Sequence, residues 1–194
     1  MKKFIVVAAL MVLFCGTALS AKSFDWSECW CNYGGGLEKG DFVVNVDTGF
    51  VFNDFSRAAS YGSFWFVPPV IVEVQYVQPI WKLPFTFGGY AGLHAYGYEY
   101  YDAKAKENKT AKNIWAFFGG EAAYHIQLPP EQLDLYASTR IGGSVPFVSH
   151  GSVSPADCFH VGGAMGANWF FTDFFGVNLE FGYPFSKFGV TFKF

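Results

Sequence analysis

After Phe14 the chain has no apolar run that approaches the length of a membrane-spanning helix. Such a helix needs about 20 consecutive apolar residues. Charge is scarce as well, because Asp, Glu, Lys and Arg together make up 15% of the 194 residues. Ordinary globular proteins contain about 25% of charged residues. The first shortage argues against a bundle of membrane helices, and the second argues against a fully water-covered surface.

Apolar and aromatic residues are nevertheless abundant, and they are spread along the whole chain. Hydrophobic residues account for 52% of the sequence, with 24 Phe and 11 Tyr. A chain of this kind can occupy a bilayer without a spanning helix if its strands close into a barrel, because closure pairs every backbone N–H and C=O group. Each strand of such a barrel alternates between side chains that face lipid and side chains that face the interior.

The first 20 residues have the pattern of a secretory signal peptide. Lys2 and Lys3 precede an apolar run that ends at Phe14, and small residues follow up to a cleavage site after Ser20. A lipid-modified cysteine is the alternative, but Cys15 follows bulky Phe14, where a small residue is usual. Cleavage removes two lysines and no acids, so the formal net charge changes from -3 to -5. A chain of that charge has no basic face for nucleic acid.

Period-two alternation of apolar and polar side chains is the main pattern after residue 40. Such alternation is typical of strands with one apolar and one polar face. We expect residues 21–40 to form a pre-barrel segment, either in the periplasm or as a plug, and residues 41–194 to form the barrel. The expected strands cover residues 41–52, 70–77, 85–101, 113–128, 133–147, 158–170, 175–183 and 187–194. The sequence leaves the register of the third strand open: if Phe87 faces lipid, then Tyr90 and His94 face inside.

Except for the last outer connection, over residues 184–186, which is short, the connections between the expected strands alternate in length, as they do in membrane barrels with short periplasmic turns and long outer loops. The short connections cover residues 79–84, 129–132 and 172–174, and the longer, more polar ones cover residues 53–66, 102–112 and 148–157. A secreted soluble sandwich or a lipocalin-like barrel would show the same alternation. Its polar faces would carry many charged residues, whereas the polar faces here are rich in Gly, Ser, Thr and Tyr. We therefore favour the membrane barrel.

The last eight residues alternate strictly between polar and apolar side chains. Their spacing resembles the C-terminal assembly signal of bacterial outer-membrane β-barrels, in which Lys187, Gly189, Phe192 and Phe194 fill the characteristic positions. With its strands and its leader, the chain resembles the superfamily of small eight-stranded outer-membrane barrels, which includes OmpA-type, OmpX-type and OmpW-type proteins. The resemblance implies an all-β, closed antiparallel transmembrane barrel in the bacterial outer membrane. It also implies outer-membrane lipids and the barrel-assembly machinery as partners.

Several ionisable residues fall near the middle of inward strand faces, where they would form one layer inside the barrel. They are Asp47, Glu73, Glu121, Arg140 and Glu180, with His94 close by. Arg140 is the one cation that we place at this height. Four carboxylates around one guanidinium cannot all ionise at low cost in a narrow interior. The layer is either a polar core that holds the barrel closed or a gate that responds to protons or ions.

Three cysteines follow the signal peptide, which is an odd number for an oxidising compartment. Cys29 and Cys31 precede the barrel, whereas Cys158 begins a strand on the outer side. A bridge to Cys158 requires the pre-barrel segment to thread the interior; otherwise the first two cysteines form a strained local bridge, pair between chains or stay free. A Cys-x-Cys pattern is weak support for zinc, since structural zinc sites have four ligands. We expect neither a metal nor a cofactor.

A catalytic role has little support in the sequence. His150, Ser152 and Asp157 share one outer loop, but no oxyanion motif accompanies them. The first expectation is a non-enzymatic outer-membrane protein that serves membrane integrity, surface display or very limited solute passage. The second is an OmpW-like channel for small hydrophobic molecules, although the charged layer departs from the largely apolar interior of that family. A lipid-modifying hydrolase of the outer membrane is the third.

Overall fold

The computed structural model describes residues 29–52, 63–150 and 158–194. The predicted signal peptide, over residues 1–20, and the beginning of the predicted pre-barrel segment lie outside the described residues. Within the described residues, no helix is long and apolar enough to cross a bilayer.

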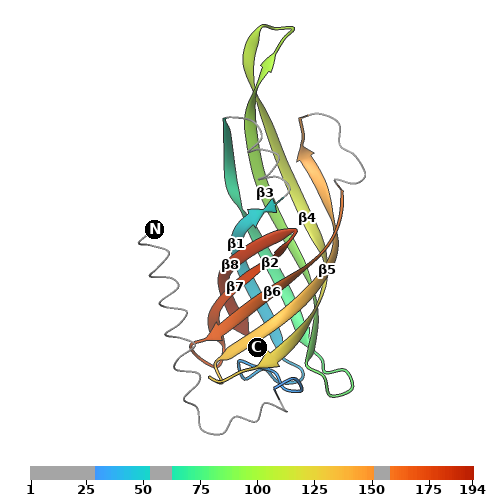
Figure 1. Cartoon of the computed structure of the whole chain (residues 1–194), viewed down its shortest axis with the longest axis vertical. Coiled ribbons are helices and arrows are strands. Elements are labelled where there is room, and N and C mark those ends of the chain that lie inside the picture. The colour runs from blue at the N-terminus through green and yellow to red at the C-terminus, as the bar shows by residue number, and fades with distance from the viewer. Residues whose placement is uncertain (1–28, 53–62, 151–157) are drawn as a thin grey trace.

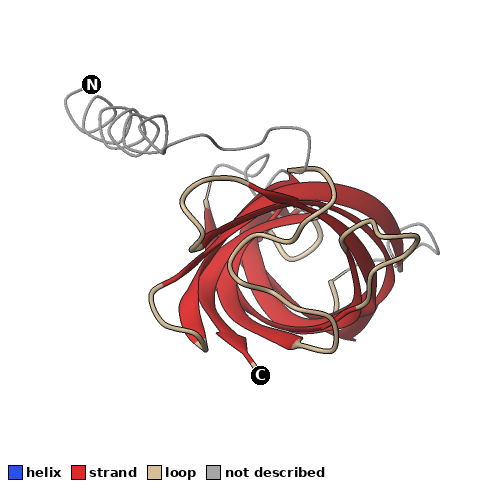
Figure 2. Ribbon diagram, turned by 90° about the horizontal axis from the view of Figure 1, so that it is seen from below, coloured by secondary structure: helices blue, strands red, loops and turns tan. Residues whose placement is uncertain are grey.

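Eight antiparallel strands form a closed barrel (Figure 1). They are β1 (Phe42–Val51), β2 (Phe64–Val77), β3 (Phe85–Asp102), β4 (Glu107–Gln127), β5 (Leu133–Val148), β6 (Phe159–Phe170), β7 (Phe175–Tyr183) and β8 (Phe185–Lys193). Each strand is hydrogen-bonded to the next one along the chain, and β8 pairs with β1, which closes the ring (Figure 2). The predicted fold class is therefore confirmed.

Side chains alternate between the interior and the outer surface, because successive residues of a pleated strand point to opposite faces. In β3, Tyr90 and His94 are buried while Phe87 and Leu93 are exposed, which settles the register that the sequence left open for this strand. The same alternation in the other strands places most of their buried polar side chains inside the ring.

The strand β2 is longer than predicted, because it begins at Phe64 instead of residue 70. Pro68 and Pro69 lie inside it, where the pairing with β3 shifts register between Val67 and Val70. Proline has no N–H to donate to a neighbouring strand, so it is confined to edges and to irregular positions such as this one. The prediction that the loop extends to residue 66 is therefore wrong, because β2 already begins at Phe64 and continues through the two prolines.

The strand β4 is also longer than predicted, because it begins at Glu107 within the expected loop over residues 102–112. β3 and β4 stay paired as far as Asp102 and Glu107, so they form a hairpin that projects beyond the rest of the barrel (Figure 1). The Asp102 carboxylate accepts hydrogen bonds from the backbone N–H groups of Lys104 (2.9 Å) and Ala105 (3.2 Å) and so stabilises the turn. The mixed charges belong to a water-exposed hairpin rather than to a loop.

Residues 29–41, which we call the cap, lie across the end of the barrel at which β8 finishes (Figure 2). The backbone N–H of Gly35 donates to the Leu133 carbonyl (3.2 Å), and the Tyr33 hydroxyl donates to the Phe85 carbonyl (2.7 Å). The Lys193 ammonium donates to the Gly36 carbonyl at 2.8 Å. Gly35 and Gly36 have φ angles of 64° and 63°, which glycine adopts at little cost.

The cap also buries apolar surface. Leu37 packs in one cluster with Val43, Val77 and Phe170, which come from three different strands. Backbone hydrogen bonds and apolar packing together hold the cap against the barrel end. The expectation left open a periplasmic segment or a plug, and the described part of this segment covers the end of the ring.

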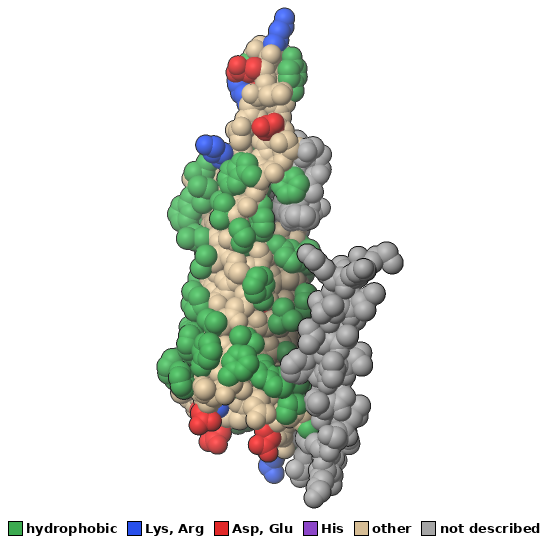
Figure 3. Space-filling model, turned by 90° about the vertical axis from the view of Figure 1, so that its left-hand side faces the viewer, with side chains coloured by type: hydrophobic (Ala, Val, Ile, Leu, Met, Phe, Trp, Pro, Cys, Tyr) green, Lys and Arg blue, Asp and Glu red, His purple; other side chains and the backbone are tan. Residues whose placement is uncertain are grey.

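The outer surface of the barrel is apolar over most of its height (Figure 3). Large apolar side chains on it are 36% or more exposed, among them Val46, Val72, Leu93, Phe118, Ile141, Val161, Met165, Leu179, Phe181 and Phe188. On the face drawn in Figure 3, the Asp, Glu, Lys and Arg side chains lie towards the two ends, and the wall between them is mostly apolar. A water-soluble monomer rarely exposes an apolar patch of this extent. A ring with apolar side chains outside and charged side chains inside is a transmembrane barrel.

Candidate functional site

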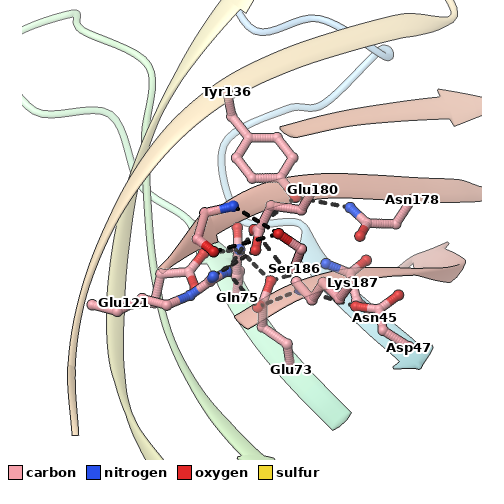
Figure 4. Close-up of polar contacts among 12 residues, drawn as sticks. Asn45, Asp47, Glu73, Gln75, Glu121, Tyr136, Asn178, Glu180, Ser186 and Lys187 are labelled. Atoms are coloured by element: carbon pink, nitrogen blue, oxygen red, sulfur yellow. Dashed lines mark hydrogen bonds and ion pairs between the residues drawn. The ribbon is translucent and has the colours of Figure 1, made fainter. Parts of the chain in front are cut away.

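The structure brings five of the six residues of the predicted charged layer together and adds a sixth that was not predicted there. We call the group the charge cluster; it consists of Asp47, Glu73, Glu121, Arg140, Glu180 and Lys187 (Figure 4). Each of these side chains is at most 5% exposed. The alternation of β1, β2, β4, β5, β7 and β8 points them into the same part of the barrel interior.

Arg140 is the centre of the charge cluster. Its Nη1 and Nη2 atoms donate to the two carboxylate oxygens of Glu180, each at 2.5 Å. Its Nε atom donates to Glu121, and Nη2 lies 3.3 Å from Glu73 Oε2. The planar guanidinium matches a carboxylate with two parallel hydrogen bonds, which a lysine cannot do. The Phe185 ring covers the guanidinium, with 4.6 Å between the Arg140 Cζ atom and the ring centroid.

Lys187 is the second cation of the cluster. Its Nζ atom lies 2.6 Å from Glu73 Oε2, 2.9 Å from Asp47 Oδ2 and 4.0 Å from Glu180 Oε2. The expectation that Arg140 is the one cation at this height is therefore wrong. Alternation does put Lys187 on the polar face of β8, but the pairing of Glu180 with Lys187 between β7 and β8 decides which side chains it meets.

His94 lies one layer away from the charge cluster. Its ring centroid is 5.6 Å from that of Phe117, and Phe117 in turn packs on Phe185 at 5.3 Å. Phe185 covers Arg140, so two aromatic rings separate His94 from the guanidinium. The layer that contains these rings also includes Ile71 and Tyr90.

The charge cluster holds four carboxylates and two cations, so its formal charge is -2. Side-chain amides stabilise part of the excess negative charge by hydrogen bonds. Asn45 Nδ2 donates to Glu73 at 2.9 Å, and Gln75 Nε2 donates to Glu73 at 2.6 Å and to Glu121 at 2.9 Å. Such hydrogen bonds stabilise buried carboxylates that would otherwise pay the full cost of lost hydration.

Three carboxylates of the cluster have the spacing of a metal site. Oxygen atoms of Glu73, Glu121 and Glu180 lie within 4.8 Å of one another. Arg140 contacts all three, however, and Lys187 contacts Glu73 and lies near Glu180. The carboxylate oxygens that a metal would need already pair with these two side-chain cations, so the geometry favours a network of ion pairs.

The residues of the expected assembly signal close the ring. Gly189 pairs with Asp47 in β1, and a Cβ atom at this position would lie 2.2 Å from the Val46 carbonyl oxygen, so a larger residue would clash with the backbone. Phe192 and Phe194 stack, with 6.5 Å between their ring centroids. Phe194 is 71% exposed, and its backbone exchanges two hydrogen bonds with Phe42 in β1.

The remaining candidates do not form a second site in the described part of the chain. Cys29 is buried in the cap and Cys31 is exposed there, while Cys158 precedes β6 at the opposite end of the barrel. The cap does not thread the interior to reach Cys158. His150 packs its ring on Tyr100 at 4.6 Å. Ser152 and Asp157, its proposed catalytic partners, lie outside the described residues.

Comparisons with known proteins add a fold similarity. No protein-family model and no curated protein match the chain. Among solved structures, the chain is similar to a protein described as a de novo design of transmembrane beta-barrels. The two are 13% identical, the match covers 81% of this chain and 98% of the other, and the TM-score is 0.42. The assignment of a membrane barrel rests on the strand topology and on the apolar outer surface.

Proposed function

We propose that this chain is a non-enzymatic integral protein of the bacterial outer membrane that serves membrane integrity or surface display and passes very little solute. The burial of the charge cluster carries this proposal. Arg140, Glu73 and Glu180 are 0% exposed, whereas inward side chains of a water-filled pore would contact water. Eight strands enclose an interior just wide enough for side chains to fill.

Two further features support a closed barrel. The aromatic layer of Tyr90, Phe117 and Phe185 packs directly on the charge cluster. The cap covers the end of the ring beyond the cluster, through its hydrogen bonds to Leu133 and Phe85. A solute that crosses the barrel would have to displace the cap, lose its hydration shell where the ion pairs lie, and move the aromatic rings.

Conductance across a planar bilayer tests this function. We expect the purified full-length chain to insert without producing discrete current steps at neutral pH, because its interior ion pairs leave no path for hydrated ions. An open porin in the same bilayer serves as the positive control. Regular current steps from the wild-type chain, reproducible between preparations, would contradict the closed barrel.

The proposed partners are outer-membrane lipids, along the apolar wall, and the barrel-assembly machinery, which would act on the exposed aromatic end of β8. In this orientation the cap and the short β4–β5 turn face the periplasm, and the β3–β4 hairpin faces the outside. The polar hairpin suits water, and the apolar wall between the two ends suits lipid.

Epitope tags test the proposed location and orientation. A tag inserted beside Glu107, at the tip of the hairpin, should be labelled by antibody on intact cells, because exposed tips tolerate insertion. The matched insertion beside Glu131, in the turn at the cap end, should be labelled only after the outer membrane is permeabilised. Equal labelling at both positions on intact cells would show that this topology is wrong.

The charge cluster argues against an OmpW-like channel, the second expectation from the sequence. A hydrophobic molecule that crosses the interior would have to pass Arg140 and Lys187, and separating these cations from their carboxylates in a dry interior is costly. We therefore do not include such transport in the proposed function.

A further inference from the structure

A chain of buried polar side chains leads from the charge cluster towards the cap, and its hydrogen atoms can be counted. It begins at Gln75, whose Nε2 atom donates to Glu73 Oε1 (2.6 Å) and Glu121 Oε1 (2.9 Å). Glu73 also contacts Arg140 and Lys187 and is ionised, so its oxygens only accept; Gln75 therefore presents Nε2 to it, and the Oε1 atom of Gln75 must accept. Thr86 Oγ1 lies 2.7 Å from that Oε1 atom, and the Thr86 hydroxyl therefore donates to Gln75.

The next contact is with His125. Its Nε2 atom lies 2.9 Å from Thr86 Oγ1. Because the one hydroxyl hydrogen of Thr86 already points to Gln75, the Nε2 atom must carry a hydrogen and donate it to Thr86. The side chains of Thr86 and His125 are at most 1% exposed, so water does not supply the missing hydrogen from the solvent side.

The other ring nitrogen of His125 meets a carboxylate. Nδ1 lies 2.9 Å and 3.0 Å from the two carboxylate oxygens of Asp134. Asp134 Oδ2 also accepts a hydrogen bond from Asn168 Nδ2 at 2.9 Å. A hydrogen must therefore lie between Nδ1 and the Asp134 carboxylate as well.

Three contacts therefore need three hydrogens: His125 to Asp134, His125 to Thr86, and Thr86 to Gln75. A neutral imidazole and a hydroxyl supply only two. We propose that the His125–Asp134 pair binds one additional proton, and that this proton completes the polar link between the charge cluster and the capped end of the barrel. The added proton makes the pair an imidazolium beside a carboxylate, and the imidazolium donates one N–H to Asp134 and the other to Thr86.

Among the described residues in contact with His125, Asp134 is the acidic partner. From β5 the ring of Tyr136 packs on His125 at 5.6 Å, and from the cap the ring of Tyr33 packs on it at the same distance. Burial raises the pKa of Tyr33 to about 12, so this phenol carries no charge near neutral pH. Thr86 and Asn168, from β3 and β6, do not titrate. Glu73 and Glu121 are reached only through Gln75.

The proton has a structural consequence. Without it, either the contact between Thr86 and Gln75 or the contact between His125 and its neighbours loses its hydrogen, and two acceptor atoms then face each other at less than 3 Å. A buried pair of unsatisfied acceptors is destabilising. Loss of the proton would thus uncouple the charge cluster from the end of the barrel that Tyr33 covers.

Asp134→Asn tests the proposal with little change in shape. The new amide can donate from Nδ2 to His125 Nδ1 and still accept from Asn168 through Oδ1. His125 then needs only one ring hydrogen, on Nε2, to keep all three contacts. The variant therefore removes the demand for the extra proton while it keeps the hydrogen bonds.

The measurement is nitrogen NMR of the full chain in lipid bilayers, with its histidines labelled with ¹⁵N, at pH 7.5. A free histidine is mostly neutral at this pH because its reference pKa is about 6.5. We expect both ring nitrogens of His125 to be protonated in the wild type and only one in Asp134→Asn, with the signal assigned through His125→Gln. His160, whose Nε2 atom meets the Tyr90 hydroxyl at 2.6 Å, should not change.

Either of two results would overturn the proposal. A wild-type spectrum in which His125 has a single protonated nitrogen excludes the stored proton, whatever the variants do. Retention of both ring protons in a folded Asp134→Asn variant would show that the carboxylate does not hold the proton. The first of these results comes from the wild-type chain itself, and the His125→Gln variant serves only to assign its signal.

Discussion

Replacing Arg140 with Ala should lower the free energy of unfolding by about 3–5 kcal/mol, the cost of removing one partner from a buried ion pair. Arg140 is 0% exposed and contacts three carboxylates. Its loss leaves Lys187 as the one described cation beside four acids. The uncompensated carboxylates would have to take up protons or admit water, and both responses oppose the closed, dry interior.

Unfolding by urea in lipid vesicles, followed by tryptophan fluorescence and by the shift in gel mobility on heating, measures this loss. Arg140→Lys is the first control, because it keeps the charge but loses the paired hydrogen bonds to Glu180, so it should be intermediate. Lys109→Ala is the second, because it removes a cation whose ion pair with Asp102 is exposed at the hairpin, and it should change stability little. If Arg140→Ala unfolds at the same urea concentration as the wild type, the cluster does not stabilise the barrel.

Replacing Val72 with Arg should destabilise the barrel by about 2–4 kcal/mol, the cost of an arginine on the lipid face near the bilayer midplane. Val72 is 43% exposed on the outer wall, between Val46 of β1 and Ala91 of β3. It precedes Glu73, whose side chain lies in the charge cluster, so it is at the height of the cluster. On a water-exposed surface the same substitution would be nearly neutral.

Val148→Arg is the matched control, because Val148 is 45% exposed but ends β5, near the end of the barrel where we expect the bilayer to end. We expect it to cost about 0–1 kcal/mol, as arginine does near the interface. The comparison uses the same unfolding assay in vesicles of defined thickness. Equal losses for Val72→Arg and Val148→Arg would contradict a bilayer around the barrel wall.

Several corrections to the sequence prediction have one origin, namely contacts between strands. The two prolines of β2 argue against a strand when the segment is taken alone, yet pairing with β3 carries the strand past them through a shift in register. The residues after Asp102 have the composition of a loop, yet β3 continues to pair with β4 beyond the barrel. Propensity and composition describe a segment alone, whereas strand length here depends on the neighbouring strand.

The polar link to the cap could not be predicted from the sequence, although its residues lie on predicted inward faces. His125 is inward by alternation, but nothing in its neighbourhood along the chain identifies Thr86 as the partner of its second nitrogen. The two residues are 39 positions apart, and they meet because the register of β3 against β4 pairs Thr86 with Ala123, two residues before His125. The count of hydrogens that implies a stored proton depends on three such meetings at once.

The sequence by itself determined the alternating strands, the number of strands and the side to which each side chain points, because the period of a pleated strand is local and needs no information about its neighbours. It therefore predicted that Glu73, Arg140 and Glu180 point inward. Only the tertiary structure decided which inward side chains meet, because that depends on the register of every pair and on closure of β8 against β1. Closure brings Lys187 to Glu73, 114 residues away along the chain, and places two aromatic rings between Arg140 and His94.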